Sequence, residues 1–156
     1  MHTIIDRREL TKGDMISITV EAPAIARKAE PGQFIILRVH EDGERIPLTI
    51  ADFDRELGTV SIIFQVVGKT TRLLNELEAG DSILDFVGPL GLATHLAGYR
   101  RVAVIGGGLG SAIAYPQAKK LHQLGAHVDM IAGFRNQDLI ILEDEMRGVA
   151  DRLIIT

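Results

Sequence analysis

The sequence predicts an antiparallel β-barrel followed by a partial α/β domain of the Rossmann-like type. Up to about residue 88, short apolar segments with alternating or β-branched residues are separated by turn-forming residues. Such segments in regular succession are typical of an antiparallel barrel or sandwich. After Gly91 the pattern changes to a continuous apolar strand, a glycine-rich loop and an amphipathic helix. This alternation of strand and helix predicts a parallel, doubly wound sheet.

Six strands and one helix are expected in the first part of the chain. The expected strands are 4–10, 15–21, 33–40, 46–53, 59–67 and 82–87. The helix is expected at about 70–77, because Leu73, Leu74 and Leu77 share one face and Gly80 follows as a stop.

Three strands alternate with two helices in the second part. The strands are expected at 101–105, 127–133 and 152–155, and the helices from the glycine loop to about 124 and over 139–149. Pro116 lies inside the first helix and predicts a kink near Tyr115. The boundary falls within 92–100, which predicts a barrel domain at 1–95 and an α/β domain at 96–156. These elements make half of a usual dinucleotide-binding domain, and the chain stops directly after an apolar strand, so we expect a truncated α/β domain and a longer parent protein.

Composition excludes several classes of function. The chain has 156 residues, 46% of them apolar and 24% charged, as in a soluble globular protein. A net charge of -4 without a basic block argues against a nucleic-acid partner. No apolar run approaches the roughly 20 residues of a membrane-spanning helix, and no signal peptide begins the chain. We therefore expect no membrane association and a cytoplasmic location.

The absence of cysteine limits the chemistry. With no cysteine, the chain can hold neither a disulfide nor a thiolate-ligated iron-sulfur cluster. The five histidines lack a spacing that gathers metal ligands, so no metal site is assigned. No set of acid, base and nucleophile indicates hydrolysis. Redox chemistry in this chain therefore requires a bound cofactor.

The segment from Arg45 to Thr49 is the first candidate site. Arginine can neutralise a diphosphate, and a threonine four residues later can hydrogen-bond the reactive edge of a flavin ring. An arginine near a turn and a threonine in a strand are also common structural residues. The motif alone leaves both interpretations open.

The segment from Gly68 to Thr71 is the second candidate site, because it leads into the expected helix. Free backbone N–H groups and the positive end of the helix dipole suit a phosphate. Thr70 or Thr71 can equally serve as an ordinary helix cap. The pattern therefore fits either a phosphate site or simple capping.

Two glycine-rich segments follow. Gly88-Pro89-Leu90-Gly91 predicts a turn, which either links the domains or lets backbone approach a ligand. The loop from Gly106 to Gly110 lies between a buried strand and a helix, the context of a dinucleotide fingerprint. Ser111 replaces the third glycine, and Arg135 rather than an acid follows the next strand. An arginine there can meet a 2′-phosphate or lie on the surface.

Taken together and in this order, these motifs resemble the ferredoxin-NADP reductase superfamily. Within it, the chain is most similar to the flavin subunits of NADH-dependent reduced ferredoxin:NADP oxidoreductases, also described as sulfide dehydrogenases. The electron-transfer subunits of dihydroorotate dehydrogenases are near relatives. The resemblance spans essentially the whole chain and implies a ferredoxin reductase-like, FAD-binding barrel followed by the first half of an NAD(P)-binding domain.

The resemblance also implies which residues bind cofactors. The implied cofactor-binding residues are Arg45, Pro47, Leu48, Thr49, Gln65, Val66, Val67, Gly68, Lys69, Thr70 and Thr71 for FAD, and Gly107, Gly108, Gly110, Gly133 and Arg135 for the nicotinamide nucleotide. Thr49 is expected near the flavin ring, and the segment from Gly68 near the phosphates. A [2Fe-2S] cluster is implied only for a C-terminal part beyond this chain. No catalytic side chain is expected, because hydride transfer needs no acid or base.

The implied function is FAD-dependent electron transfer between NAD(P)H and iron-sulfur centres. The implied partners are a nicotinamide nucleotide and either ferredoxin or an iron-sulfur flavoprotein subunit. Two alternatives remain: a flavin-binding electron-transfer module without its own nicotinamide site, and a cofactor-free subunit-interaction fragment. In the second alternative the edge after Ile155 pairs with a partner or with a second copy in a homodimer. The sequence does not decide whether the nicotinamide nucleotide is NAD or NADP.

Overall fold

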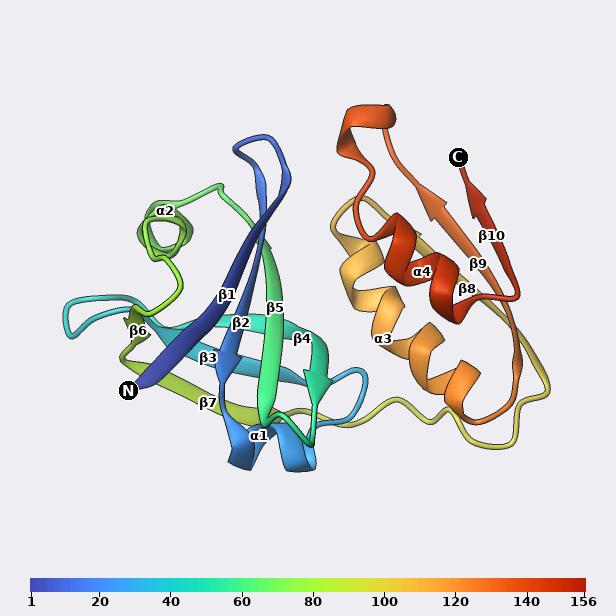
Figure 1. Cartoon of the computed structure of the whole chain (residues 1–156), viewed down its shortest axis with the longest axis horizontal. Helices are drawn as coiled ribbons and strands as arrows, with labels where there is room; N and C mark the ends of the chain where they lie inside the picture. The colour runs from blue at the N-terminus through green and yellow to red at the C-terminus, as the bar shows by residue number, and fades with distance from the viewer. The chain divides into compact units, whose positions relative to one another are not determined.

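The computed structural model describes all 156 residues and divides into two compact units, Met1–Ala93 (unit 1) and Thr94–Thr156 (unit 2). Unit 1 holds a seven-stranded sheet of order β6-β1-β2-β5-β4-β3-β7, in which every pairing is antiparallel (Figure 1). Its strands are β1 (His2–Thr11), β2 (Met15–Glu21), β3 (Phe34–Arg38), β4 (Ile46–Asp54), β5 (Thr59–Gln65), β6 (Ser82–Ile83) and β7 (Asp85–Leu90). One residue separates β6 from β7, so the two edges of the sheet lie close in the chain and the barrel is nearly closed. The predicted antiparallel barrel is confirmed.

The barrel interior is filled by aliphatic side chains from alternating strand positions. Ile18 on β2 lies opposite Ile62 on β5, and Ile62 lies opposite Ile50 on β4; all three are at most 1% exposed. Apolar burial of this kind is the main stabilising contribution in a small barrel. Inward-facing positions on three neighbouring strands therefore form the centre of the barrel core.

The barrel carries two helices, where the sequence predicted one. Helix α2 (Lys69–Asn75) is the expected helix, whereas α1 (Pro23–Lys28) was not predicted. Proline at the start of α1 favours a first helical turn, and its Ile25 and Ala26 are buried against the barrel. A helix of six residues is too short for its apolar spacing to stand out from that of a loop.

Two expectations about the last barrel strands were wrong. The expected strand 82–87 is divided into β6 and β7, and Gly88-Pro89-Leu90 continues β7 instead of forming a turn. The pairing of β7 with β3 explains why residue 88 is a glycine. A Cβ atom at Gly88 would lie only 2.7 Å from the Ile35 Cγ2 atom on the paired strand. The chain turns away only at Gly91, whose φ of +79° favours glycine.

Unit 2 is a three-stranded parallel sheet of order β10-β9-β8 with helices packed against it, as predicted (Figure 1). Its elements are β8 (Arg101–Gly107), α3 (Gly110–Gln123), β9 (His127–Gly133), η1 (Gln137–Leu139), α4 (Glu143–Val149) and β10 (Arg152–Ile155). Helix α3 continues past Pro116, and the kink near Tyr115 stays a prediction. The expected helix 139–149 was wrong in its first turn, because Leu142 adopts a left-handed conformation with φ of 57° and α4 begins only after it.

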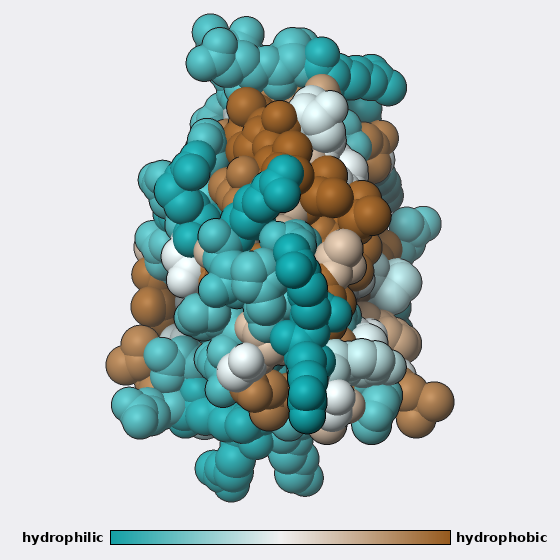
Figure 2. Space-filling view, turned by 90° about the vertical axis from the view of Figure 1, so that its right-hand side faces the viewer, coloured by the Kyte–Doolittle hydropathy of each residue, from teal (hydrophilic) through white to brown (hydrophobic).

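The two faces of the unit 2 sheet differ. Val104 and Met130 are buried, whereas Ile105, the next residue on β8, is 71% exposed. Ile131 on β9 lies beside Ile105 in register, Ile154 on β10 lies beside Ile131, and apolar side chains gather on this side of the unit (Figure 2). None of the helices in the chain is long and apolar enough to span a lipid bilayer.

Candidate functional site

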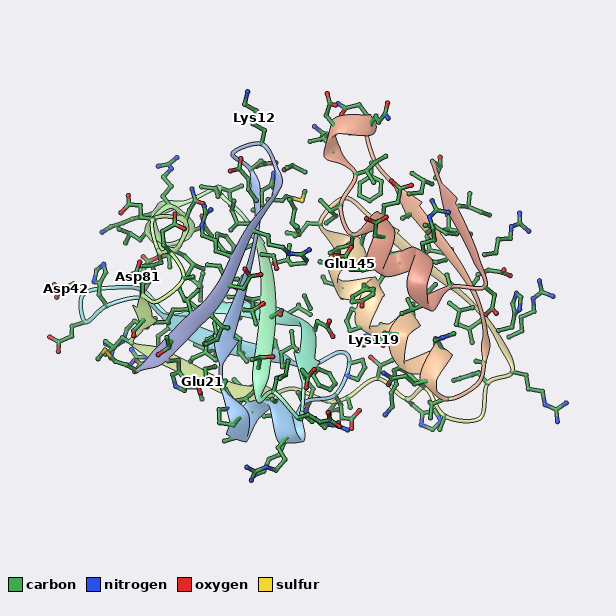
Figure 3. All side chains as sticks on the ribbon, in the orientation of Figure 1. Lys12, Glu21, Asp42, Asp81, Lys119 and Glu145 are labelled. Atoms are coloured by element: carbon green, nitrogen blue, oxygen red, sulfur yellow. The ribbon has the colours of Figure 1, made fainter.

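Two of the barrel segments predicted for cofactor binding lie together. The Thr70 hydroxyl on α2 donates a hydrogen bond to the Glu44 carboxylate over 3.4 Å. Glu44 directly precedes Arg45 in the loop between β3 and β4, whose exposed tip carries Asp42 (Figure 3). The start of α2 is therefore held beside the loop that carries Arg45, although the two segments are separated in the sequence.

Arg45 is one of the exposed cations of this region. Its Nη2 atom lies 3.4 Å from the Asp85 Oδ2 atom, and its side chain is 60% exposed. The same oxygen accepts a shorter hydrogen bond of 2.7 Å from Arg38 Nε. Arg45 is thus only weakly held by the protein, and its guanidinium remains open to an anionic ligand.

Strand alternation separates the three other residues predicted on β4. Pro47 lies opposite Ile36 and Thr49 lies opposite Phe34, so both belong to one face of the β3-β4 ladder. Leu48 belongs to the other face and packs against the barrel core. The Thr49 hydroxyl makes no hydrogen bond within the protein, which leaves it available to a ligand, whereas the Leu48 side chain is not on the same face.

The end of β5 is anchored to the β1–β2 turn. Gln65 Nε2 lies 3.1 Å from both carboxylate oxygens of Asp14, and the Val66 N–H donates to the Asp14 carbonyl. Val66 packs partly against the barrel core, whereas Val67 is 67% exposed. This segment places Val67 on the surface directly before α2.

Thr71 closes the start of α2 through its side chain. Its hydroxyl accepts hydrogen bonds from the Val67 and Gly68 N–H groups at 3.0 and 2.9 Å and donates to the Gly68 carbonyl. The capping interpretation therefore holds for this hydroxyl. As at the start of any α-helix, the N–H groups of the first turn of α2 have no i−4 carbonyl acceptor within the helix, which suits an anion.

The far end of α2 is also tied to the barrel. Arg7 Nη2 on β1 donates to both the side-chain and the backbone oxygen of Asn75, at 2.6 and 3.2 Å. A cation at this end complements the helix dipole. The sequence reasoning missed Arg7, because no local pattern relates it to a residue 68 positions away.

In unit 2, the predicted glycines gather where the parallel strands end. Gly107 lies opposite Gly133 at the carboxyl ends of β8 and β9. Gly108, with φ of +51°, donates its N–H to the Gly133 carbonyl over 2.9 Å. The N–H groups of Leu109 and Gly110 have no acceptor in the protein. This arrangement is an open loop at the carboxyl edge of a parallel sheet, the usual location of ligands in such folds.

Arg135 follows the same edge. It is exposed, forms no ion pair, and comes shortly after Phe134, whose N–H donates to the Thr156 carbonyl over 2.8 Å. Arg135 is therefore an unpaired cation two residues after β9. Strand β9 ends with Gly133 and not with a carboxylate.

Gly106 and Ser111 bring β8 and α3 into close contact at the glycine loop. A Cβ atom at Gly106 would lie 2.9 Å from the Ser111 Cα atom, so Gly106 is required for close packing of β8 on α3. Ser111 is fully buried, and its hydroxyl has no partner. The small residue in place of the third glycine was the sequence signal for this contact.

The carboxyl groups with a shifted pKa, Asp129 and Asp151, lie away from the candidate binding sites. The hydrogen bond to His127 lowers the pKa of Asp129, and Arg101 lowers it further. The Val128 N–H lowers the pKa of Asp151. These groups lie at or just before the amino ends of β9 and β10, opposite the glycine loop. No three His, Asp or Glu side chains lie close enough together to hold a metal ion.

Comparison with known proteins gives close relatives. A Clostridium beijerinckii protein, described as an uncharacterized protein in the adh 3′ region, is 45% identical over 163 residues, covering 100% of this chain and 55% of that protein. A Thermotoga maritima homologue of the electron transfer subunit of dihydroorotate dehydrogenase B (NAD(+)) is 42% identical, covering 92% of this chain and 51% of that protein. No family model matches the chain.

A solved structure has the same fold. The structure of an NADH-dependent reduced ferredoxin-NADP oxidoreductase superposes with a TM-score of 0.92 at 38% identity, covering 99% of this chain and 56% of that one. The predicted resemblance and the ferredoxin reductase-like fold are thereby confirmed. The chain spans about half the length of the relatives it matches.

Proposed function

We propose that this chain, an electron-transfer module with a ferredoxin reductase-like fold, binds FAD on unit 1 and a nicotinamide nucleotide on unit 2. Electrons then pass between NAD(P)H and iron-sulfur centres or ferredoxin. In this proposal the chain is the FAD-binding part and the first half of the nucleotide-binding part of a longer oxidoreductase subunit. The observation that carries the proposal is the hydrogen bond that holds the start of α2 beside the Arg45 loop.

The residues of this region fit the diphosphate of FAD. Arg45 has an exposed guanidinium, Lys69 is exposed, and the N–H groups of the first turn of α2 have no i−4 carbonyl acceptor within the helix. Arginine and unpaired backbone N–H groups are the donors that phosphate oxygens prefer. Gly68 has open space where a side chain would stand, so a ligand can approach its backbone closely. The Thr71 hydroxyl already caps the helix, so this proposal gives it no contact with the phosphates.

The ring of the flavin is assigned to the face of β4 that carries Pro47 and Thr49. Pro47 offers an apolar surface, and the unpaired Thr49 hydroxyl offers a hydrogen bond to the reactive edge. Gln65, Val66 and Val67 adjoin this region on the chain just before α2. When bound, the flavin exchanges two electrons with a nicotinamide and single electrons with an iron-sulfur centre. The protein contributes placement and electrostatics, and no side-chain acid or base is required.

Unit 2 is assigned to the nicotinamide nucleotide. Gly107, Gly108 and Gly110 present backbone without side chains at the carboxyl edge, beside Gly133. Arg135 is assigned to the 2′-phosphate of NADP, which is supported by its exposed, unpaired guanidinium and by the lack of a carboxylate at the end of β9. A ferredoxin or an iron-sulfur flavoprotein subunit is the proposed partner. A [2Fe-2S] cluster is assigned to the additional length that the relatives have.

The first experiment is to purify the chain, record its visible spectrum and identify the released flavin by chromatography. Near-stoichiometric FAD, or uptake of added FAD, is expected. Arg45→Met is expected to weaken FAD binding more than riboflavin binding, because only FAD carries the diphosphate. A colourless protein that takes up no FAD, together with a colourless longer protein, would contradict the proposal.

One observation favours a second function, the subunit-interaction fragment. Ile105 is 71% exposed on one face of the unit 2 sheet, where it begins a row of three isoleucines that continues through Ile131 on β9 to Ile154 on β10. Exposed apolar faces of this kind commonly mark interfaces. Sedimentation at increasing concentration distinguishes the functions, because a colourless protein that dimerises would favour the fragment over the flavin module.

A further inference from the structure

We infer that Arg38 is a positioning residue, which binds Asp85 and thereby keeps the Arg45 guanidinium available to the diphosphate of FAD. The inference rests on the proposed function. Its basis is one carboxylate oxygen, Asp85 Oδ2, that lies between two arginines. Arg38 Nε is 2.7 Å from this oxygen, and Arg45 Nη2 is 3.4 Å from it.

The shorter contact is set by the strands. Arg38 on β3 and Asp85 on β7 are directly opposite in the antiparallel ladder, and their side chains are 22% and 30% exposed. Cross-strand pairs of opposite charge at such positions are held together by the backbone register. Arg45 instead belongs to a loop, and its side chain is 60% exposed. Asp85 therefore bonds mainly to Arg38, and Arg45 is the weaker partner.

Arg38 also restrains the loop itself. Its Nη1 atom donates to the Glu41 carbonyl over 3.2 Å, in the loop that leads to Arg45. One guanidinium thus binds the strand carboxylate and the start of the loop. This second contact does not involve Asp85, so its contribution can be separated by removing Asp85.

The charges explain why Arg38 matters for an anionic ligand. Arg38, Asp85 and Arg45 together carry one net positive charge. Without Arg38, the Asp85 carboxylate can bind Arg45 fully, and no net positive charge remains. The Glu44 carboxylate directly before Arg45 adds a further anion to this region. Loss of Arg38 therefore lowers FAD affinity even though Arg38 itself need not touch the ligand.

The test compares FAD dissociation constants, measured by flavin fluorescence, of the chain and its variants. Arg38→Met keeps the aliphatic stem and is expected to weaken binding about twofold to fivefold, the range of a partly exposed charge pair. The double variant R38M/D85N is expected to recover most of the lost affinity, because the competing carboxylate is gone. A merely structural role of Arg38 predicts no such recovery.

The matched control is Arg55→Met. Arg55 pairs with Glu30 over 2.8 Å and donates to the Ala29 carbonyl, so it resembles Arg38 in its contacts. R55M is expected to bind FAD as the unsubstituted chain does. Unchanged affinity in R38M, or equal weakness in R38M and R38M/D85N, overturns the inference. If R45M also leaves FAD affinity unchanged, the proposed diphosphate site itself is wrong; if only R45M weakens it, the inference alone fails.

Discussion

Gly106 on β8 lies so close to Ser111 on α3 that a Cβ atom at Gly106 would be 2.9 Å from the Ser111 Cα atom. The same Cβ atom would be 3.1 Å from the Ala114 Cβ atom. The glycine loop of unit 2 thus begins with a packing requirement, one residue before the glycines assigned to the nucleotide. This contact fixes where α3 begins relative to the end of β8.

Gly106→Ala is expected to destabilise unit 2 by about 1–3 kcal/mol, because the helix backbone cannot move away cheaply. Thermal unfolding of the chain, with amide exchange in α3, measures the effect. Gly148→Ala is the control: Gly148 lies in α4 with open space around it, so alanine there is expected to raise stability by about 0.5–1 kcal/mol. Equal effects of the two substitutions would contradict the packing role.

Thr71→Val is expected to open the start of α2. The hydroxyl accepts from two N–H groups, so its loss is expected to cost about 1–2 kcal/mol locally. Amide exchange at Val67 and Gly68 should then be faster by about tenfold, and FAD binding should weaken. Thr71→Ser keeps the hydroxyl and serves as the control. Unchanged exchange in the valine variant would show that the cap is unimportant.

Thr49→Val tests the assignment of the flavin ring. Loss of a hydrogen bond worth about 1 kcal/mol corresponds to a shift of about 20 mV in a two-electron potential. We therefore expect a potential shift of this order with little change in FAD affinity, and Thr49→Ser should behave as the unsubstituted chain does. Spectroelectrochemical titration measures the potential. An identical potential in all three proteins would remove Thr49 from the site.

The stability of unit 2 is expected to fall in acid. Asp129 and Asp151 both have a pKa below the ordinary value of 3.8 in the folded protein. The unfolded chain therefore binds protons more readily, and this stabilisation is complete above about pH 4 and is lost as the pH falls through the folded pKa values. Thermal unfolding between pH 2 and pH 7 should show the loss.

Asp151→Asn isolates one of these carboxylates. It should lower stability at neutral pH and flatten the acid decline, since the Val128 N–H then loses its charged acceptor. Asp138→Asn is the control, because the Asp138 side chain is exposed and has no partner. A decline as steep in D151N as in the unsubstituted chain would show that Asp151 does not contribute.

Local patterns predicted much of the fold. The strands 15–21, 127–133 and 152–155 were predicted with their observed bounds, because continuous or alternating apolar runs report burial directly. Helix α1 was missed because six residues carry too little periodicity. The predicted start of the helix 139–149 was wrong because Leu142 adopts a left-handed conformation. Leucine rarely adopts this conformation, so the sequence gives no signal for it.

The sequence by itself predicted the antiparallel barrel and, after it, the three-stranded parallel sheet. It also identified the separate motifs at Arg45, Gly68 and Gly107. Only the tertiary structure decided that Glu44 meets Thr70, and that Asp85 binds Arg38 more closely than Arg45. The physical reason is that local spacing encodes which residues are strand or helix. Cross-strand neighbours depend instead on register, which long-range packing of the whole barrel sets.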